Sequence, residues 1–267
     1  MNSDYVDWLA ALDDFVRDMK RFNVGRQDAD LRADYELMGT PVANTTAQFN
    51  IQTAVWQLGA ALKMQAIGTP PSAVPVLVRA AMEAATSVAW FLAPDDVNTR
   101  VERIVQLALQ DSYDQFRFEG ANGTEAYETR RRQLLAPMIK IGLTEGYFRS
   151  NRYSVTQALV DLEASTGEND LVPLWSLLSG LAHGRPWAIL ASSGADTSGG
   201  GVVQTYVPRE QYGFYQLRAA ELLDTAIGYW NERVGSMGTL REVPRLPRTL
   251  QGRAHGLPAS PWSWSPA

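Results

Sequence analysis

The chain of 267 residues contains no cysteine, so it has no disulfide bond, no thiolate metal ligand and no cysteine nucleophile. Histidine is nearly absent too, with two residues. No window reaches the roughly eighteen uninterrupted apolar residues that a membrane span requires, and the nearest, residues 80–93, contains Glu83 and stops at Pro94. Residues 1–7 are acidic and lack the basic region and apolar stretch of a signal peptide. We therefore expect a soluble cytoplasmic protein without membrane association.

Several ligand-binding motifs are also missing. No phosphate-binding loop or dinucleotide fingerprint occurs, and the glycine run at 199–201 lacks the lysine and serine or threonine that would follow it. A di-iron bundle needs Glu-x-x-His pairs, but Gly180 occupies that spacing before His183. The aspartate pair at 95–96 invites comparison with the metal motif of helical terpene cyclases, but the third carboxylate is absent. The sequence therefore predicts no metal and no cofactor.

Composition is ordinary for a globular protein, with 45% hydrophobic and 20% charged residues. The net charge of -5 gives no general attraction for nucleic acid or anionic lipid, so such binding would need a local basic patch. The strongest basic feature is the arginine run at 130–132, followed by Lys140 and Arg149. We interpret this run as a solvated helix face, with anion or RNA binding as the alternative.

Apolar residues at helical spacing, with capping and proline signals, predict about eight helices joined mostly by short connections. Residues 23–42 are polar and without a clear period, and we expect a loop there with about one helical turn. The predicted helices span approximately residues 3–22, 44–67, 72–92, 96–118, 124–141, 153–164, 170–183 and 210–234. This pattern predicts an all-α, multi-helix bundle.

Two segments depart from the helical pattern. Two short β-favouring runs, residues 188–191 and 202–207, flank a loop rich in glycine and serine, so we expect one small β-hairpin or ordered loop near 187–207. After residue 235 the hydrophobic period is lost and five prolines occur. We expect residues 1–234 to form a single α-helical domain, and residues 235–267 to form a tail that is disordered or draped over the body or a partner.

His183 closes a long apolar helix and is followed by Gly184. A histidine in the last turn interacts favourably with the negative end of the helix dipole, so it serves equally well as a capping or buried structural residue. The functional alternative is a general base or a ligand-orienting group, assisted by Arg185 just after it and by Ser179 one turn before it.

A second polar feature lies on the most apolar predicted helix. Arg79 and Glu83 are four residues apart and pair on one face. Three further residues extend the stripe: Thr86, Ser87 and Trp90. A helix this apolar is normally buried, so the pair would need polar partners, and His183, Arg100 and Arg103 are the candidates. The alternative is a solvated stripe on a partly exposed helix.

These positions carry a family resemblance. An apolar helix with Arg79 and Glu83, then a helix with arginines, then the Ser-x-x-x-His-Gly segment at residues 179–184 resemble bacterial helical proteins related to the HEPN-like bundles of toxin–antitoxin and phage-defence systems. The resemblance covers roughly residues 45–233 and implies a helical bundle. Active HEPN ribonucleases carry an arginine separated from the histidine by four to six residues, whereas the corresponding residues 176–178 here are serine and two leucines. This departure argues against metal-independent RNA cleavage.

Three functions fit these observations, and the sequence leaves open whether the chain is an enzyme. The first is a homodimeric binding or regulatory protein, of a defence or stress system, in which Arg79, Glu83, Arg100 and His183 organise the core or a ligand pocket. The second is an RNA nuclease with His183 as acid/base and arginines on the phosphate. The third is a specialised-metabolism enzyme whose eight tryptophans line an apolar pocket. The residues expected to contact a small-molecule ligand are Arg100, Arg103, Ser179 and Arg185; those expected to carry any catalysis are His183, Arg79 and Glu83.

Overall fold

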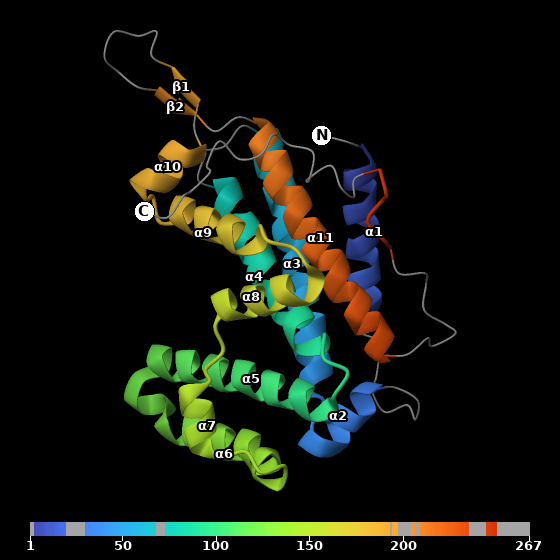
Figure 1. Cartoon of the computed structure of the whole chain (residues 1–267), viewed down its shortest axis with the longest axis vertical. Coiled ribbons are helices and arrows are strands. Elements are labelled where there is room, and N and C mark those ends of the chain that lie inside the picture. The colour runs from blue at the N-terminus through green and yellow to red at the C-terminus, as the bar shows by residue number, and fades with distance from the viewer. Residues whose placement is uncertain are drawn as a thin grey trace.

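The structure is a computed structural model that describes residues 3–19, 30–67, 73–192, 194–196, 204–206, 209–234 and 244–249. Over these residues the chain forms eleven α-helices, one short 3-10 turn (Gly120–Gly123) and one small hairpin, which confirms the predicted all-α bundle (Figure 1). The helices are α1 (Ser3–Met19), α2 (Asp30–Met38), α3 (Val42–Ala66), α4 (Ala73–Leu92), α5 (Val97–Glu119), α6 (Thr124–Lys140), α7 (Glu145–Ser150), α8 (Val155–Thr166), α9 (Leu171–Ala182), α10 (Pro186–Ser192) and α11 (Arg209–Val234).

Three short helices, α2, α7 and α10, exceed the predicted count of about eight. Helix α2 lies within the segment expected to be a loop. Helix α10 contains the first predicted strand, residues 188–191, so that prediction was wrong. The hairpin instead pairs β1 (Gly194–Asp196) with β2 (Gln204–Tyr206), with Ala195 opposite Thr205.

Local packing explains why residues 188–191 are helical. Pro186 occupies the first position of α10, where its missing N–H costs nothing and its fixed φ suits a helix. The carbonyl of Arg185 accepts hydrogen bonds from the N–H groups of Ala188 and Ile189. Ala188 then packs against Gly180 of α9, where an added Cβ would lie 2.6 Å from the Ala188 Cβ. The packing against α9 therefore overrides the β preference of the isolated segment.

Helix α4 is the centre of the main core and packs most extensively against α3 and α11, with α8 and α9 also in contact (Figure 1). Its inward side consists of small or branched apolar residues that are fully buried: Val78, Ala81, Met82, Ala85, Val88 and Ala89. Among the described helices, α4 alone has the length and composition to cross a membrane, and 72% of that apolar window is buried inside the bundle. Such burial is typical of a core helix.

A second, smaller apolar cluster lies beneath α5, α6 and α7, at the opposite end of the view from α9 and α10 (Figure 1). Its buried members come from these three helices: Val101, Val105, Ala108, Leu134, Leu135, Met138 and Phe148. The connection between α7 and α8 leads from this cluster back to the main core.

Residues 244–249 are the described part of the predicted tail, and they lie across α1 and α11. Trp8 Nε1 donates to the carbonyl of Pro244 at 3.4 Å, and the N–H of Leu246 donates to Asp224 Oδ1 at 2.9 Å. Leu246 is buried in the main core. The rest of the predicted tail lies outside the described residues.

Candidate functional site

Arg79 and Glu83 lie one turn apart on the side of α4 that faces α9. Arg79 Nε donates to Glu83 Oε1 at 2.8 Å, and the indole Nε1 of Trp175 donates to the same oxygen at 3.1 Å. The Arg79 guanidinium carbon lies 5.6 Å from the Trp175 ring centroid, in a cation–π contact. Glu83 and Trp175 together fix the orientation of the guanidinium.

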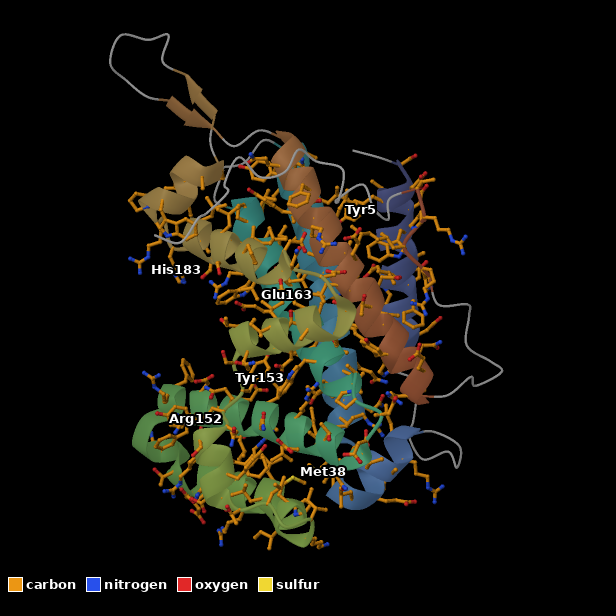
Figure 2. All side chains as sticks on the ribbon, in the orientation of Figure 1. Tyr5, Met38, Arg152, Tyr153, Glu163 and His183 are labelled. Atoms are coloured by element: carbon orange, nitrogen blue, oxygen red, sulfur yellow. The ribbon has the colours of Figure 1, made fainter. Side chains whose placement is uncertain are left out.

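His183 completes this arrangement from the end of α9 (Figure 2). Arg79 Nη1 lies 3.4 Å from His183 Nε2. Because an arginine only donates hydrogen bonds, Nε2 is the acceptor in this pair. The structure thus brings Arg79, Glu83 and His183 together from segments about a hundred residues apart.

The backbone at the end of α9 fixes the position of His183, and its capping hydrogen bonds do not involve the imidazole. The N–H of Arg185 donates to the Gly180 carbonyl at 2.8 Å, and the N–H of Gly184 donates to the Leu181 carbonyl at 3.1 Å. These two bonds form a Schellman motif, which requires the left-handed φ of 62° at Gly184. Backbone groups cap the helix, so capping does not require the His183 side chain. That side chain is exposed and available for other interactions.

The cluster is partly open to solvent. The Arg79 side chain is 24% exposed and that of Glu83 is 32% exposed. An arginine has five N–H groups; Arg79 gives one to Glu83 and one to His183. That leaves three without a partner among the described residues. The site therefore presents unused, oriented donors beside an exposed imidazole.

Two further predicted residues flank the cluster. Arg185 is exposed, and Ser179 is half-buried one turn before His183. The Ser179 carbonyl accepts a hydrogen bond from the His183 N–H at 3.1 Å. Arg185 adds positive charge to this end of α9, where Glu83 alone of the named residues is acidic.

Arg100 departs from the expectation that it joins this cluster. It forms an ion pair with Asp34 of α2 at 3.0 Å, and both side chains are 2% exposed. Its Nη1 donates to the carbonyls of Pro94 and Asp95, just beyond the end of α4. Arg233 of α11 donates to the Leu92 carbonyl in the same region. Arg233 thus satisfies a carbonyl at the end of α4, whereas Arg100 ties the connection between α4 and α5 to Asp34 of α2 and does not face a ligand.

Arg103 of α5 contacts Trp90, which lies two turns after Glu83 on α4. Its guanidinium carbon is 4.8 Å from the Trp90 ring centroid, and its Nη1 donates to the Trp90 carbonyl at 2.5 Å. Trp90 Nε1 donates to Asp161 of α8 at 2.8 Å. Tyr153 packs on Trp90 and hydrogen-bonds Ser87 at 2.7 Å (Figure 2). All three residues that extend the predicted stripe are buried, Thr86 completely and Ser87 and Trp90 almost completely.

Burial raises the pKa of the Tyr153 phenol to about 12. The nearby carboxylates of Glu83 and Asp111 act in the same direction, while the hydrogen bond with Ser87 acts against it. Tyr153 is therefore a neutral hydroxyl at physiological pH, acting as donor or acceptor and not as a base.

Sequence reasoning missed Trp175, Tyr153 and Asp161 as members of this region. Trp175 precedes His183 by eight residues, a spacing that keeps both on the same side of an amphipathic helix. That spacing was the available signal for Trp175. Within the described part of the chain, no three histidine, aspartate or glutamate side chains gather closely enough to hold a metal ion.

Comparisons with protein-family models, curated proteins and solved structures found no match to this chain. The geometry of the site is therefore the basis on which a function can be proposed.

Proposed function

We propose that the protein is a helical binding protein that recognises the acidic group of a small ligand at the end of α9. Arg79 and His183 contact the acidic group, while Glu83 and Trp175 position the guanidinium. The observation that carries this proposal is the state of Arg79, which is held by Glu83, Trp175 and His183 yet keeps three unused N–H groups at a half-open surface.

Glu83 and Trp175 already orient the Arg79 guanidinium, so little of its conformational freedom is lost when a ligand binds. A carboxylate or phosphate would then receive about two charge-assisted hydrogen bonds, each contributing about 1.5–3 kcal/mol. Their sum is about 3–6 kcal/mol before the cost of association, which places the dissociation constant of an isolated anion at about 1 mM or weaker. A complete ligand would gain further affinity from the Trp175 ring.

The experiment is an NMR titration of the histidine ring and arginine side-chain signals with acetate and with inorganic phosphate, at constant ionic strength. The protein has two histidines, so His183→Gln assigns the ring signals. We expect saturable shifts of the His183 signals with at least one of the two anions, lost in Arg79→Gln. The matched control is Arg17→Gln, which removes an exposed arginine of α1. Shifts that are absent, or that persist unchanged in Arg79→Gln, overturn the proposal.

A second function, RNA cleavage, is favoured by one observation. Arg79 supplies in space the arginine that is missing before His183 in sequence, at 3.4 Å from the imidazole. In this alternative the fold belongs to the HEPN-like bundles, His183 is the acid/base and Arg79 or Arg185 stabilises the phosphate. Purified protein should then degrade a labelled RNA, and both His183→Ala and Arg79→Ala should abolish that degradation. Equal degradation by all three proteins would identify a contaminating nuclease.

The remaining expectations stay as proposals. A homodimer is tested by sedimentation of the purified chain. The aromatic pocket of a specialised-metabolism enzyme receives less support, because Trp8, Trp90 and Trp230 are packed into the main core. Trp230 also hydrogen-bonds Asn44 at 3.1 Å, as expected of a structural residue.

A further inference from the structure

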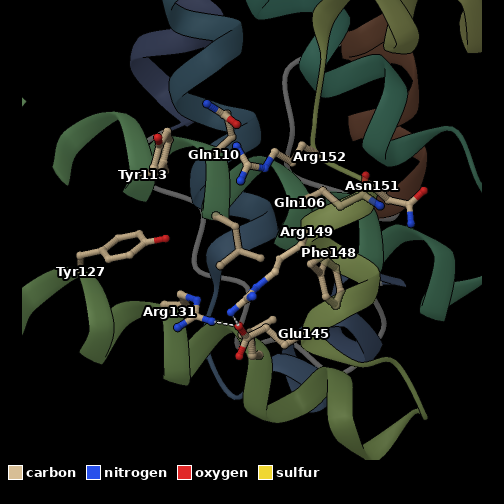
Figure 3. Close-up of a pocket in the computed structure, with 12 residues that line it drawn as sticks. Gln106, Gln110, Tyr113, Tyr127, Arg131, Glu145, Phe148, Arg149, Asn151 and Arg152 are labelled. Carbon is tan, nitrogen blue, oxygen red and sulfur yellow. Dashed lines mark hydrogen bonds and ion pairs between the residues drawn. The ribbon is translucent and has the colours of Figure 1, made fainter. Parts of the chain in front are cut away.

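A separate pocket of about 70 Å³ opens between α5, α6 and α7, in the part of the fold built on the second apolar cluster (Figure 3). Leu135 and Phe148 form its apolar wall, and Gln106 and Gln110 of α5 add amide groups. None of the residues of the α4–α9 site lines it.

Three arginines converge on this pocket from α6 and from the end of α7: Arg131, Arg149 and Arg152. Arg131 and Arg149 both pair with the carboxylate of Glu145, the one acidic residue of the lining (Figure 3). These two guanidinium groups hold the pKa of Glu145 below its usual value, with the Arg149 hydrogen bond as the largest cause. Two arginines that share one carboxylate retain donors for a further acceptor.

Arg152 differs from the other two because it has no carboxylate partner among the described residues. Its guanidinium carbon lies 5.5 Å from the ring centroid of Tyr113, which holds it at the rim by a cation–π contact. Figure 3 shows the Arg152 side chain on the α5 side of the pocket. The Tyr127 hydroxyl is directed into the pocket. A positioned but unpaired arginine at a pocket rim is a donor for an anionic ligand.

The charge and the volume of the pocket limit the chemical class of the ligand. Three arginines and one glutamate give the lining a charge of +2, in a chain whose net charge is -5. Glu128, which lies outside the lining, offsets part of the Arg131 charge through an ion pair of 2.9 Å. A water molecule occupies about 10–15 Å³ on this measure, so the pocket holds about five water-sized volumes. That is room for one tetrahedral dianion, with the rest of the ligand outside.

The rim suggests where the remainder would lie. Tyr113 and Tyr127 form an aromatic edge, and Tyr127 is held by a stacked contact with Phe116 at 5.0 Å between ring centroids. We propose that this pocket binds the phosphate group of a small phosphate monoester, with Arg131, Arg149 and Arg152 as donors and the tyrosines beside the ester substituent. A phosphate monoester is close to dianionic at neutral pH and presents three strong acceptor oxygens.

Titration with phenyl phosphate, glycerol phosphate and inorganic phosphate, at constant ionic strength and followed by NMR, tests the proposal. Phenyl phosphate should bind with saturation, and Arg152→Gln should weaken it about tenfold, the loss expected for one charge-assisted hydrogen bond. Arg132→Gln is the matched control, because Arg132 lies on the same helix as Arg131 but its hydrogen-bond partners among the described residues are Glu128 and Thr129 of α6. Phenyl phosphate binding stronger than that of the other two probes identifies an aromatic ester as the source, and equal binding identifies the phosphate group alone.

The outcome is independent of the function proposed above. Arg79→Gln should leave phenyl phosphate binding at this pocket unchanged, whatever it does to the signals of His183. The inference is overturned if no probe binds with saturation, if Arg152→Gln and Arg132→Gln weaken binding equally, or if acetate binds as tightly as phenyl phosphate.

Discussion

Replacing His183 by alanine should leave the protein folded and almost as stable as the original, because the imidazole contributes little to packing. The side chain is exposed at the end of α9, so its removal buries no polar group and opens no core cavity. The Schellman bonds that close α9 come from the backbone of Gly184 and Arg185, and they survive the substitution.

The expected magnitude is set by the single hydrogen bond that the substitution removes. The Arg79–His183 distance of 3.4 Å is long for a hydrogen bond, and the pair lies at the surface. A neutral-acceptor hydrogen bond of this kind contributes about 0.5–1.5 kcal/mol at most. Arg79 keeps its bond to Glu83 and its cation–π interaction with Trp175, so no buried charge is left unpaired. We therefore expect a stability decrease of about 1 kcal/mol or less, and a melting temperature lower by about 2–4 °C.

The assay is urea unfolding followed by far-ultraviolet circular dichroism, combined with the anion titration described above. His183→Ala should shift the unfolding midpoint slightly without changing its slope with urea, and should weaken anion binding. A stability decrease above about 3 kcal/mol is typical of breaking a buried polar network. Such a decrease would assign His183 a structural role and refute the reasoning that its side chain is free to meet a ligand.

Two other predictions test the structural assignments around the site. Arg100→Met should cost about 3–5 kcal/mol in the same urea assay, because it leaves the Asp34 carboxylate buried without its partner. The control Arg32→Gln removes an exposed ion pair from α2, the helix that carries Asp34, and should cost less than about 1 kcal/mol. Equal losses of stability in the two variants would contradict the structural role of Arg100. Burial raises the pKa of Tyr153 from 10.0 to about 12, so the folded state keeps a proton that the unfolded state loses, and stability should fall as pH rises through that window. Tyr153→Phe should reduce this decline in urea midpoints measured between pH 10 and 12, and an unchanged decline would contradict the assignment.

The long helices were predictable because their signals are local. Proline and aspartate mark the boundary between α4 and α5, and the predicted ends agree with the observed Leu92 and Val97 to within a residue or two. Asp96 caps α5 by accepting from the Thr99 N–H at 2.8 Å. Two short helices have a start signal of their own, Thr144 before α7 and Pro186 in α10, but helices of fewer than about twelve residues also depend on tertiary packing. Helix α2, for example, is held through its buried residues Leu31 and Asp34.

The large apolar residues of α3 do not all lie on its buried face. Phe49 and Trp56 are 67% and 54% exposed, whereas Val55 and Leu58 are buried. The buried face of α3 combines Ile51, Val55 and Leu58 with small residues, which are fully or almost fully buried: Ala43, Ala47, Ala54 and Ala61. Alanines allow close helix approach but contribute little to hydrophobic periodicity, so the large apolar residues alone define the buried face incompletely.

A charged pair on a buried helix requires further polar groups, and this rule gave three candidate partners for Arg79 and Glu83: His183, Arg100 and Arg103. His183 contacts Arg79, whereas Arg100 pairs with Asp34 and Arg103 with Asp161. His183 contacts Arg79 because α9 packs on the side of α4 that carries Arg79. Arg100 serves a different need, since it pairs with the buried Asp34 carboxylate and donates to the Pro94 and Asp95 carbonyls in the connection between α4 and α5. The tertiary fold decides which groups each arginine contacts, and the spacing of residues along one helix does not encode it.

The arginine run at 130–132 does not by itself form a basic site. Successive residues of a helix point about 100° apart, so three adjacent arginines cannot share one face. Arg131 turns into the pocket and pairs with Glu145, whereas Arg132 folds back on its own helix. The positive charge that reaches the pocket is completed by Arg149 and Arg152, which follow the next turn of the chain. If the anion binds there, neutralising Arg131 or Arg152 should reduce its salt dependence, while neutralising Arg132 should not.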